Sequence, residues 1–381
     1  HSRHHRGSFA VNLNEKTVKK VDKLFLIIVG LLSAAGLLIF LSAAMGLLVR
    51  ESGASFGVVA LKQILFGLLP GLLLLWGASK VPPVFWRRNA FYIFLFSLVV
   101  TALVFVPGLG LEHGGALRWI KIFGQSFQPS ELLKIGFVIY FAAWLSGVKT
   151  RAAEFKSGLL PLIILLIVVG TLIIAQRDTD TFMVFFATGL VMYLAGGGKW
   201  RHAALLFFGA VLCVIALAFA RPYVMERFQT FLNPNVDPQG ASYQIHQSLI
   251  AIGSGGLTGR GFGQSVRKFN YLPEPMGDSI FAVVGEEFGF IGGVLLILLF
   301  TAFAWRGLWI ANRSADSFAS LTTVGIVIMI VSQSFINMAA MLNILPLSGT
   351  PLLFISQGGT ALLFALAEVG IILGVSRHIR K

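Results

Sequence analysis

Apolar and polar positions follow one another in long blocks along this chain of 381 residues. Runs of at least 17 mainly apolar residues are separated by polar connections, and the runs lack the alternation of a strand with one wet face. A helix that crosses the hydrocarbon core of a membrane needs roughly 20 apolar residues, with a range of about 17 to 25. The pattern therefore predicts ten transmembrane helices, near residues 24–48, 57–78, 90–107, 131–147, 159–175, 181–197, 202–220, 279–304, 318–345 and 352–376.

Composition favours a membrane protein and excludes soluble enzyme folds. Hydrophobic residues make up 56% of the chain and charged residues only 12%, and the mean hydropathy is +0.83. Soluble domains carry about a quarter charged residues, so this chain cannot cover a surface that faces water. We expect an all-α polytopic membrane protein with a single transmembrane domain over 24–376, flanked by a tail at 1–23 and a tail at 377–381.

Topology explains most of the basic excess. The formal net charge is +14, from 30 Lys and Arg against 16 Asp and Glu. With ten spans both termini lie on one side, and 19 of the basic residues fall in the segments of that side, against nine on the other. Basic residues accumulate on the cytoplasmic side of a membrane. Both termini are therefore predicted to be cytoplasmic, and we expect no nucleic-acid partner.

The chain contains one cysteine and no apparent cleavable signal peptide. A single cysteine excludes an internal disulfide. Because Cys213 lies within an apolar run, we expect it to have a packing role. The first apolar run is too long for the hydrophobic part of a signal peptide and follows a polar segment, so it reads as an uncleaved span. Residues 1–8, which are rich in histidine and arginine, carry no functional expectation.

Two connections on the outer side are long, 107–130 and 221–278, and long connections in compact proteins are often functional. In the larger one, residues 243–252 place apolar side chains at helical spacing, which predicts an amphipathic helix, either at the membrane interface or packed on the surface. The glycine-rich stretch 253–263 is followed by Arg267 and Lys268. It reads either as a flexible turn or as a site for a phosphate or pyrophosphate, which favours charged donors.

Asp278 immediately precedes the eighth predicted span. Aspartate is a preferred residue at the N-terminal cap of a helix, so a capping role is one interpretation. The other interpretation is a carboxylate general base at the membrane surface, facing the glycine-rich basic loop.

Ionisable residues inside membrane spans are costly, so they carry a functional expectation. Glu286 and Glu287 lie about 12 Å below Asp278 at the usual helical rise. Glu131 and Lys134 are spaced to pair with one another. Ion pairing that fixes the bundle is the structural alternative for all four, and Glu368 in the last span is similar. For two carboxylates near the fifth span, Asp178 and Asp180, simple solvation is the structural alternative. Gln128, Pro129 and Ser130 read as the start of a helix.

Four ordered segments resemble the SEDS family, whose members include RodA, FtsW and SpoVE. The segment from 243 to 289 carries the longest likeness and includes the family's Pro-Glu-x-x-x-Asp motif, with Asp278 as its aspartate. The others are 114–134, 175–181 and 333–359, so the likeness covers essentially the whole chain. The segment 264–274 is more similar to the division branch, FtsW and SpoVE, than to the elongation branch, RodA.

The resemblance departs from the family pattern at several positions. Arg177 and Asp180 replace proline and glycine in the motif at 175–181, which adds charge there. Leu353 and Gln357 stand where the family usually has proline and tyrosine. Gly277 and Ser279 flank Asp278 where threonine and phenylalanine are common.

The resemblance implies a peptidoglycan glycosyltransferase that polymerises lipid II at the outer face of the bacterial cytoplasmic membrane during cell division. It implies that Asp278 deprotonates the acceptor hydroxyl, that an undecaprenyl-linked glycan is the donor and that undecaprenyl pyrophosphate leaves. It also implies a class B penicillin-binding protein and other divisome membrane proteins as partners. From charge and position we expect substrate contacts from Arg118, Lys121, Gln128, Ser130, Glu131, Lys134, Asp178, Gln247, Ser254, Arg260, Arg267, Lys268, Glu274 and Ser356.

Two alternatives to the enzyme stay open. A lipid II flippase would be a transporter, yet internal repeats and broken helices, which are typical of transporters, are not apparent in the sequence. A non-catalytic division scaffold would not need Asp278. The pattern requires no cofactor, and it leaves open whether a divalent cation takes part, since the carboxylates are scattered.

Overall fold

The computed structural model of the chain describes residues 20–48, 55–113, 116–122, 125–220, 222–233 and 242–379. Within these ranges the protein is a bundle of apolar helices. Eight helical segments are long and apolar enough to cross a membrane, and two shorter apolar helices, Ala90–Phe105 and Thr179–Ala195, complete the pattern. These ten segments coincide with the ten predicted runs, apart from their boundaries.

The helices that form the bundle have the following bounds, with shorter helical turns between several of them. They are α1 (Lys23–Ala44), α2 (Phe56–Gln63), α3 (Leu69–Ala78), α4 (Pro83–Arg88), α5 (Ala90–Ala102), α6 (Pro129–Val148), α7 (Leu160–Ala175), α8 (Thr179–Ala195), α9 (Trp200–Ala220), α13 (Ile280–Arg313), α14 (Ser317–Met341) and α15 (Gly359–Ser376). A π-helical turn, Ile64–Leu68, joins α2 to α3.

Aspartates start several of these helices. The carboxylates of Asp22, Asp178 and Asp316 each accept a hydrogen bond from the backbone N–H three residues further on, at the start of α1, α8 and α14. Such a side chain satisfies one of the N–H groups that the first helical turn leaves without a partner. Short polar residues thus mark helix starts between the apolar runs.

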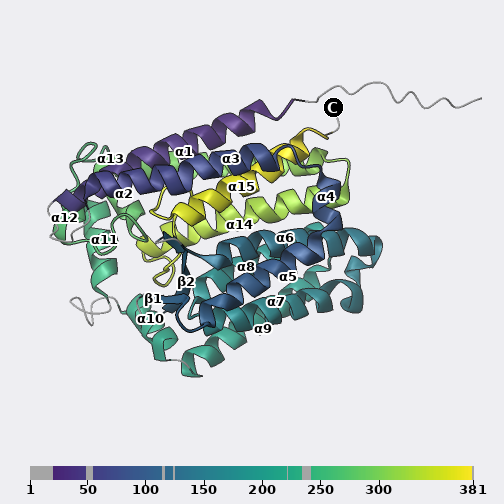
Figure 1. The fold of residues 1–381 in the computed structure, drawn as a ribbon. Helices are drawn as coiled ribbons and strands as arrows, with labels where there is room; N and C mark the ends of the chain where they lie inside the picture. Colours follow the sequence, from purple (N-terminus) through teal and green to yellow (C-terminus); the bar gives the residue numbers. More distant parts are fainter. Residues whose placement is uncertain are drawn as a thin grey trace, which may run out of the picture.

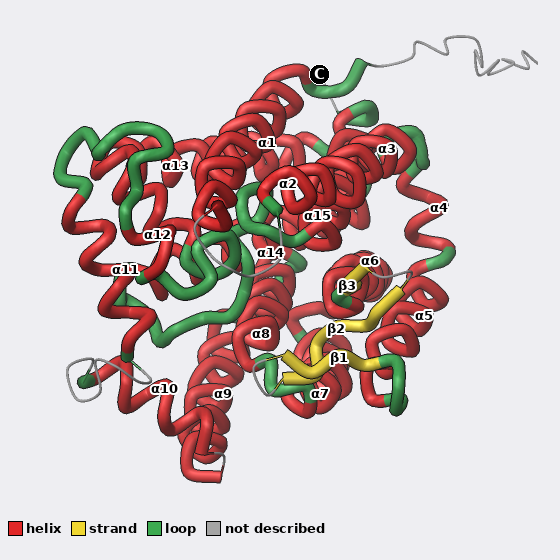
Figure 2. The backbone as a smooth tube through the Cα atoms, turned by 60° about the vertical axis from the view of Figure 1, so that its left-hand side comes forward, coloured by secondary structure: helices red, strands yellow, loops and turns green. Residues whose placement is uncertain are grey.

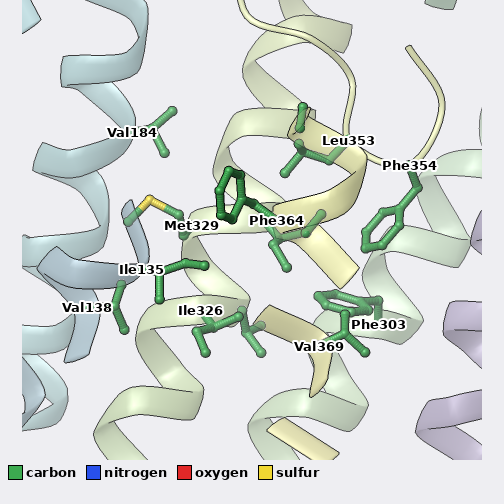
Figure 3. Close-up of a cluster of buried hydrophobic side chains, with 14 of the residues drawn as sticks. Ile135, Val138, Val184, Phe303, Ile326, Met329, Leu353, Phe354, Phe364 and Val369 are labelled. Carbon is green, nitrogen blue, oxygen red and sulfur yellow. The ribbon is translucent and has the colours of Figure 1, made fainter. Parts of the chain in front are cut away.

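Helix α14 lies in the middle of the bundle, as Figures 1 and 2 show, and packs against α6, α8, α13 and α15. Its apolar neighbours form a continuous core, part of which is drawn in Figure 3. There Ile326 and Met329 of α14 lie between Val138 of α6, Val184 of α8 and residues of α15. Because α14 is packed on several sides, it can hold the segments that contact its ends in fixed positions.

The two ends of the bundle differ (Figure 1). One end carries a small antiparallel sheet together with α10 (Pro222–Leu232), α11 (Tyr243–Ser254) and α12 (Arg267–Asn270). The other end carries α4, the start of α1 and the end of α15. There Asp22 pairs with Arg306 at 2.7 Å, and its backbone N–H donates to Ser376 Oγ at 3.0 Å. Both described ends of the chain therefore lie at the end of the bundle opposite the sheet.

The sheet was not predicted from the sequence. Its strands are β1 (Gly110–His113), β2 (Ala116–Ile122) and β3 (Gln125–Phe127), paired antiparallel in the order β1-β2-β3. Strands this short fall inside a connection that also contains glycines and charges, so no periodic signal distinguishes them from a loop. The predicted amphipathic helix at 243–252 is confirmed as α11.

Helix α13 is broken, whereas the sequence predicts a continuous span. Gly289 has φ +64° and ψ −161°, which interrupts the helix after Phe288. The glycine-rich stretch supplies the missing partners: Arg260 N–H and Gly261 N–H donate to the carbonyls of Glu286 and Glu287. Phe290 N–H and Ile291 N–H donate in turn to the carbonyls of Gly256 and Leu257. The break is thus sealed by backbone hydrogen bonds from a second segment.

The last predicted span, 352–376, was wrong at its start. Helix α15 begins at Gly359, and the residues before it form turns. Ser356 Oγ accepts from Leu352 N–H at 2.9 Å and donates to the carbonyl of Gly277 at 2.8 Å. The run is apolar because it is buried inside the protein, not because it is helical.

Candidate active site

Asp278 lies in the turn that leads into α13, at the end of the bundle that carries the sheet. Its backbone carbonyl accepts a hydrogen bond from Asn337 Nδ2 of α14 at 2.9 Å. The neighbouring Ser279 Oγ accepts from Gln244 Nε2 of α11 at 2.9 Å, and the carbonyl of Gly277 accepts from Ser356. Three separate elements therefore fix the backbone on which Asp278 stands.

The carboxylate of Asp278 is not a helix cap. Ser279 occupies the cap position of α13, and the first turn has no side-chain cap. Among the residues that the structure describes, none donates a hydrogen bond to the Asp278 carboxylate. The side chain is only partly exposed. An aspartate in this state keeps its oxygens available for a substrate.

Two arginines and two further aspartates surround Asp278. A Cβ placed on Gly349 would lie 3.0 Å from Arg118 Nη1, 3.7 Å from Asp278 Oδ2 and 3.9 Å from Asp180 Oδ2. Glycine at 349 therefore leaves open the point at which these three side chains converge. Arg227 of α10 joins the group through Asp180.

Each arginine is held by an aspartate from the start of α8. Arg118 Nη1 lies 3.6 Å from Asp178 Oδ1, and Arg118 Nη2 donates to the carbonyl of Arg177. Arg227 Nη1 donates to both oxygens of Asp180, at 2.9 and 3.1 Å. Arg118 Nε is buried and has no partner in the part of the chain that the structure describes. Solvation, the structural alternative for Asp178 and Asp180, is excluded, because both are buried, at 0% and 6% exposure.

The surroundings of Asp278 favour its protonated form. Burial and then the charge of Glu274 raise the pKa of Asp278 to about 7, and Asp180 acts in the same direction. Arg118 and Arg227 oppose the increase without cancelling it. A general base works best when its pKa lies near the working pH, so this environment suits proton abstraction near neutrality.

The basic residues of the glycine-rich region gather elsewhere. Lys268 is fully buried, and its Nζ lies 2.7 Å from Glu287 Oε1, 3.0 Å from Ser42 Oγ and 2.9 Å from the carbonyl of Gly263. Glu286 accepts hydrogen bonds from Ser265 Oγ and from two backbone N–H groups that start α12. The proposed ion pairing of these two glutamates is found.

Arg260 and Arg267 belong to the same cluster. Arg260 Nη1 lies 3.7 Å from Glu286 Oε1, and its Nε donates to the carbonyl of Ser254 at 3.4 Å. Arg267 donates to Gln247 Oε1 at 2.6 Å. Since Glu286 is eight residues beyond Asp278, about 12 Å along a helix, this cluster does not face Asp278. The expectation that a basic glycine-rich loop faces the aspartate was therefore wrong, because that loop seals the break in α13.

A third polar group is buried between α6, α14 and α15. Lys134 Nζ lies 2.6 Å from Glu131 Oε2 and also donates to Gln333 Oε1. Glu368 of α15 is buried beside this pair. Gln128 Oε1 and Ser130 Oγ are buried without partners among the described residues. The predicted pairing of Glu131 with Lys134 is found, and residues 128–130 start α6 as expected.

The remaining expected site residues are spread over this end of the bundle. Lys121 is exposed on β2, and Glu274 is exposed in the Asp278 turn with a positive φ of 45°. Ser356 is buried and serves the backbone, as described above. Within the described residues there is no group of three or more His, Cys, Asp and Glu side chains that could hold a metal ion.

Four residues beside Asp278 were not among the expected site residues: Asp180, Arg227, Asn337 and Gly349. They lie on α8, α10, α14 and the segment before α15, so only the fold brings them together. Asp180, Asn337 and Gly349 fall inside motif segments, which was the available signal. Arg227 carries no local signal within the long outer connection.

Comparison with known proteins places this geometry in context. Residues 22–381 match the FtsW/RodA/SpoVE family, described as cell cycle protein. Stage V sporulation protein E of Bacillus subtilis is 36% identical over 96% of this chain and 100% of its own length. A probable peptidoglycan glycosyltransferase FtsW of Geobacter is 34% identical over 96% of this chain and 99% of its own.

Solved structures agree with the fold. A peptidoglycan synthase complex that coordinates polymerization and crosslinking contains a chain that superposes with a TM-score of 0.78 and 26% identity, covering 94% of this chain and 98% of that one. The rod shape determining protein RodA of Thermus thermophilus superposes with a TM-score of 0.69 and 25% identity, covering 95% of this chain and 98% of RodA.

Proposed function

The chain belongs to the family of membrane proteins that comprises FtsW, RodA and SpoVE, and on that basis we propose that it is a peptidoglycan glycosyltransferase of cell division. Its substrate is lipid II, which it polymerises into glycan strands. The bundle lies in the bacterial cytoplasmic membrane with both termini in the cytoplasm. The end with the sheet and Asp278 faces outward, where lipid II is consumed.

The observation that carries the proposal is the Asp278 carboxylate beside two arginines, since it accepts no hydrogen bond from the described part of the chain. In the proposed step Asp278 accepts the proton of an acceptor sugar hydroxyl. The oxygen attacks the anomeric carbon of the donor glycan, and the bond from that carbon to the pyrophosphate breaks. Undecaprenyl pyrophosphate leaves with the bonding electron pair. Arg118, with a free and buried Nε, supports the proposal as the group that meets the departing charge.

A transporter that flips lipid II is the competing function, and the broken helix α13 is the one feature that favours it. Transporters use the free backbone groups of such a break to bind a substrate. Here the groups at the break bind the glycine-rich stretch instead. The break therefore supports a structural role, and the catalytic proposal is preferred over a transporter or a silent scaffold.

Glycan polymerisation from lipid II by the purified full chain tests the proposal. The protein is assayed alone and with the class B penicillin-binding protein of its own organism, the proposed partner. We expect glycan strands in at least the second case. Asp278→Asn keeps the size of the side chain but cannot take a proton, and we expect it to form no product. Lipid II translocation without any glycan product in either case would contradict the enzyme and favour the flippase.

We propose no resident cofactor, and the same assay examines the role of a divalent cation. A chelator is added, and Mg²⁺ or Mn²⁺ is then restored. Loss of activity that either ion rescues would indicate a cation that arrives with the pyrophosphate of the substrate. Unchanged activity would indicate that Arg118 and Arg227 neutralise the charge of the departing pyrophosphate without a cation.

A further inference from the structure

Asp180 is the residue of this site that the family motif does not explain, because the motif has glycine at this position. It lies in the first turn of α8 and is almost fully buried. Both of its oxygens accept from Arg227, and Oδ2 also accepts from the backbone N–H of Gly349 at 2.9 Å. One carboxylate thus joins α8, α10 and the segment before α15.

The two elements that Asp180 joins both border Asp278. The Cβ direction of Gly349 faces Asp278 Oδ2, and the same point faces Asp180 Oδ2. Arg227 projects from α10, which packs mainly on α9 and lies at the rim of the bundle. The buried carboxylate of Asp180 binds this guanidinium at 2.9 Å, in the surroundings of Asp278.

Asp278 is faced by charges from four elements. Glu274 belongs to its own turn, Arg118 to β2, Asp180 to α8 and Arg227 to α10, while Asp178 neutralises Arg118. Asp180 opposes the ionisation of Asp278 and Arg227 favours it. Since the two are paired at 2.9 Å, they act on Asp278 from neighbouring points and in opposite directions.

We propose that Asp180 is a positioning residue of this site: it holds Arg227 and the backbone of Gly349 beside Asp278, and the balance of the Asp180–Arg227 pair sets the pH range in which Asp278 acts as a base. The inference rests on the proposed function and extends it to a residue that contacts no reacting atom. Removing one charge of the pair leaves the other unbalanced. The two single substitutions therefore act in opposite directions.

The test is the pH profile of glycan polymerisation for Asp180→Asn, Arg227→Gln and the double variant. We expect the acid limb of the profile to move down by about one pH unit in Asp180→Asn and up by about one unit in Arg227→Gln. The double variant should return close to the wild-type midpoint. A purely structural role would lower the rate at every pH without moving the midpoints in opposite directions.

Asp316→Asn is the matched control, since Asp316 also starts a helix but lies exposed at the other end of the bundle. Its midpoint should equal that of the wild type. An unshifted midpoint in Asp180→Asn, or shifts of both single variants in one direction, would overturn the inference.

A second measurement separates this inference from the proposed function. The melting temperature is measured against pH for the protein with Asp278 and for the same protein with Asp278→Asn. The difference between the two reports the ionisation of Asp278 and requires no activity. We expect the midpoint of that difference to fall with Asp180→Asn and to rise with Arg227→Gln. If the wild type makes no glycan, the proposed function fails, and these melting curves alone decide the inference.

Discussion

The side-chain amide of Asn337 donates one hydrogen bond to the backbone carbonyl of Asp278 and another to that of Thr350, both at 2.9 Å. Asn337 belongs to α14, the helix at the centre of the bundle. One rigid helix therefore sets the distance between the Asp278 turn and the segment that carries Gly349.

Replacing Asn337 tests this support. Asn337→Leu fills the same space but donates no hydrogen bond, so the Asp278 turn should shift and kcat for glycan synthesis should fall by about 10- to 100-fold. Steady-state kinetics with lipid II measure the effect. The control is Asn312→Leu, an exposed position near the far end of α13, which should leave kcat unchanged. Equal kinetics for the two variants would show that the turn is held by its other bonds.

The pH dependence of activity follows from the charge of Asp278. Its pKa is raised to about 7 by burial first and by Glu274 second. The base is active when deprotonated, so the rate should rise with pH through about 7. Glu274→Gln removes a repelling charge, which lowers the pKa of Asp278 and should move the rise to lower pH. A rise that stays in place would mean that Glu274 is too well screened by solvent to act.

The ionisation of Asp278 should also affect stability: activity rises with pH, whereas the free energy of unfolding falls. The folded chain binds the proton of Asp278 more tightly than the unfolded chain, whose carboxyl keeps the ordinary value of 3.8. The stability that this proton contributes is fully present below the unfolded pKa of 3.8, and it is lost as the pH rises from there through about 7. Asp278→Asn should therefore gain thermal stability over the wild type as pH rises, by up to ~4 kcal/mol. Melting curves from acid to alkaline pH check the sign, and a gain that is constant over this range would contradict the shift.

The buried pair of Lys268 and Glu287 should contribute more to stability than the pair of the exposed Arg260 with the buried Glu286. Lys268→Met leaves Glu287 buried without its cation, which costs about 3–5 kcal/mol. Arg260 is 42% exposed at its side chain and lies 3.7 Å from its partner, so Arg260→Met should cost at most ~1 kcal/mol. Thermal unfolding of both variants tests the order. The double variant Lys268→Met with Glu287→Gln should recover much of the loss, and similar losses for both single variants would contradict the expected difference.

The backbone hydrogen bonds between the glycine-rich stretch and the break in α13 depend on glycine at position 259. Its φ is +81°, and a Cβ there would overlap the carbonyl of Glu287. Gly259→Ala should therefore destabilise the protein by more than 1 kcal/mol. In contrast, Gly57 of α2 has open space around it, so Gly57→Ala should be neutral or stabilising. Melting temperatures of the two variants decide, and an unchanged value for Gly259→Ala would show that the break tolerates movement.

Local chemistry in the sequence is enough for part of this structure. Apolar runs of bilayer length identify the helical segments, because lipid leaves the backbone no partner outside the helix. The pairing of Glu131 with Lys134 follows from their spacing on one helix. Asp278 stands out because it immediately precedes a span and is the aspartate of the Pro-Glu-x-x-x-Asp motif.

Tertiary structure alone decided what surrounds Asp278 and what the glycine-rich stretch does. The basic residues nearest to Asp278 in sequence bind elsewhere: Lys268 pairs with the buried Glu287 of α13, and the Arg267 guanidinium donates to Gln247 of α11. Arg118 and Arg227 reach Asp278 from β2 and α10 instead. A buried charge takes the partner that the fold places within reach, whatever the distance along the chain. For the same reason Asp178 and Asp180, which sequence position leaves solvated, become the buried anchors of both arginines.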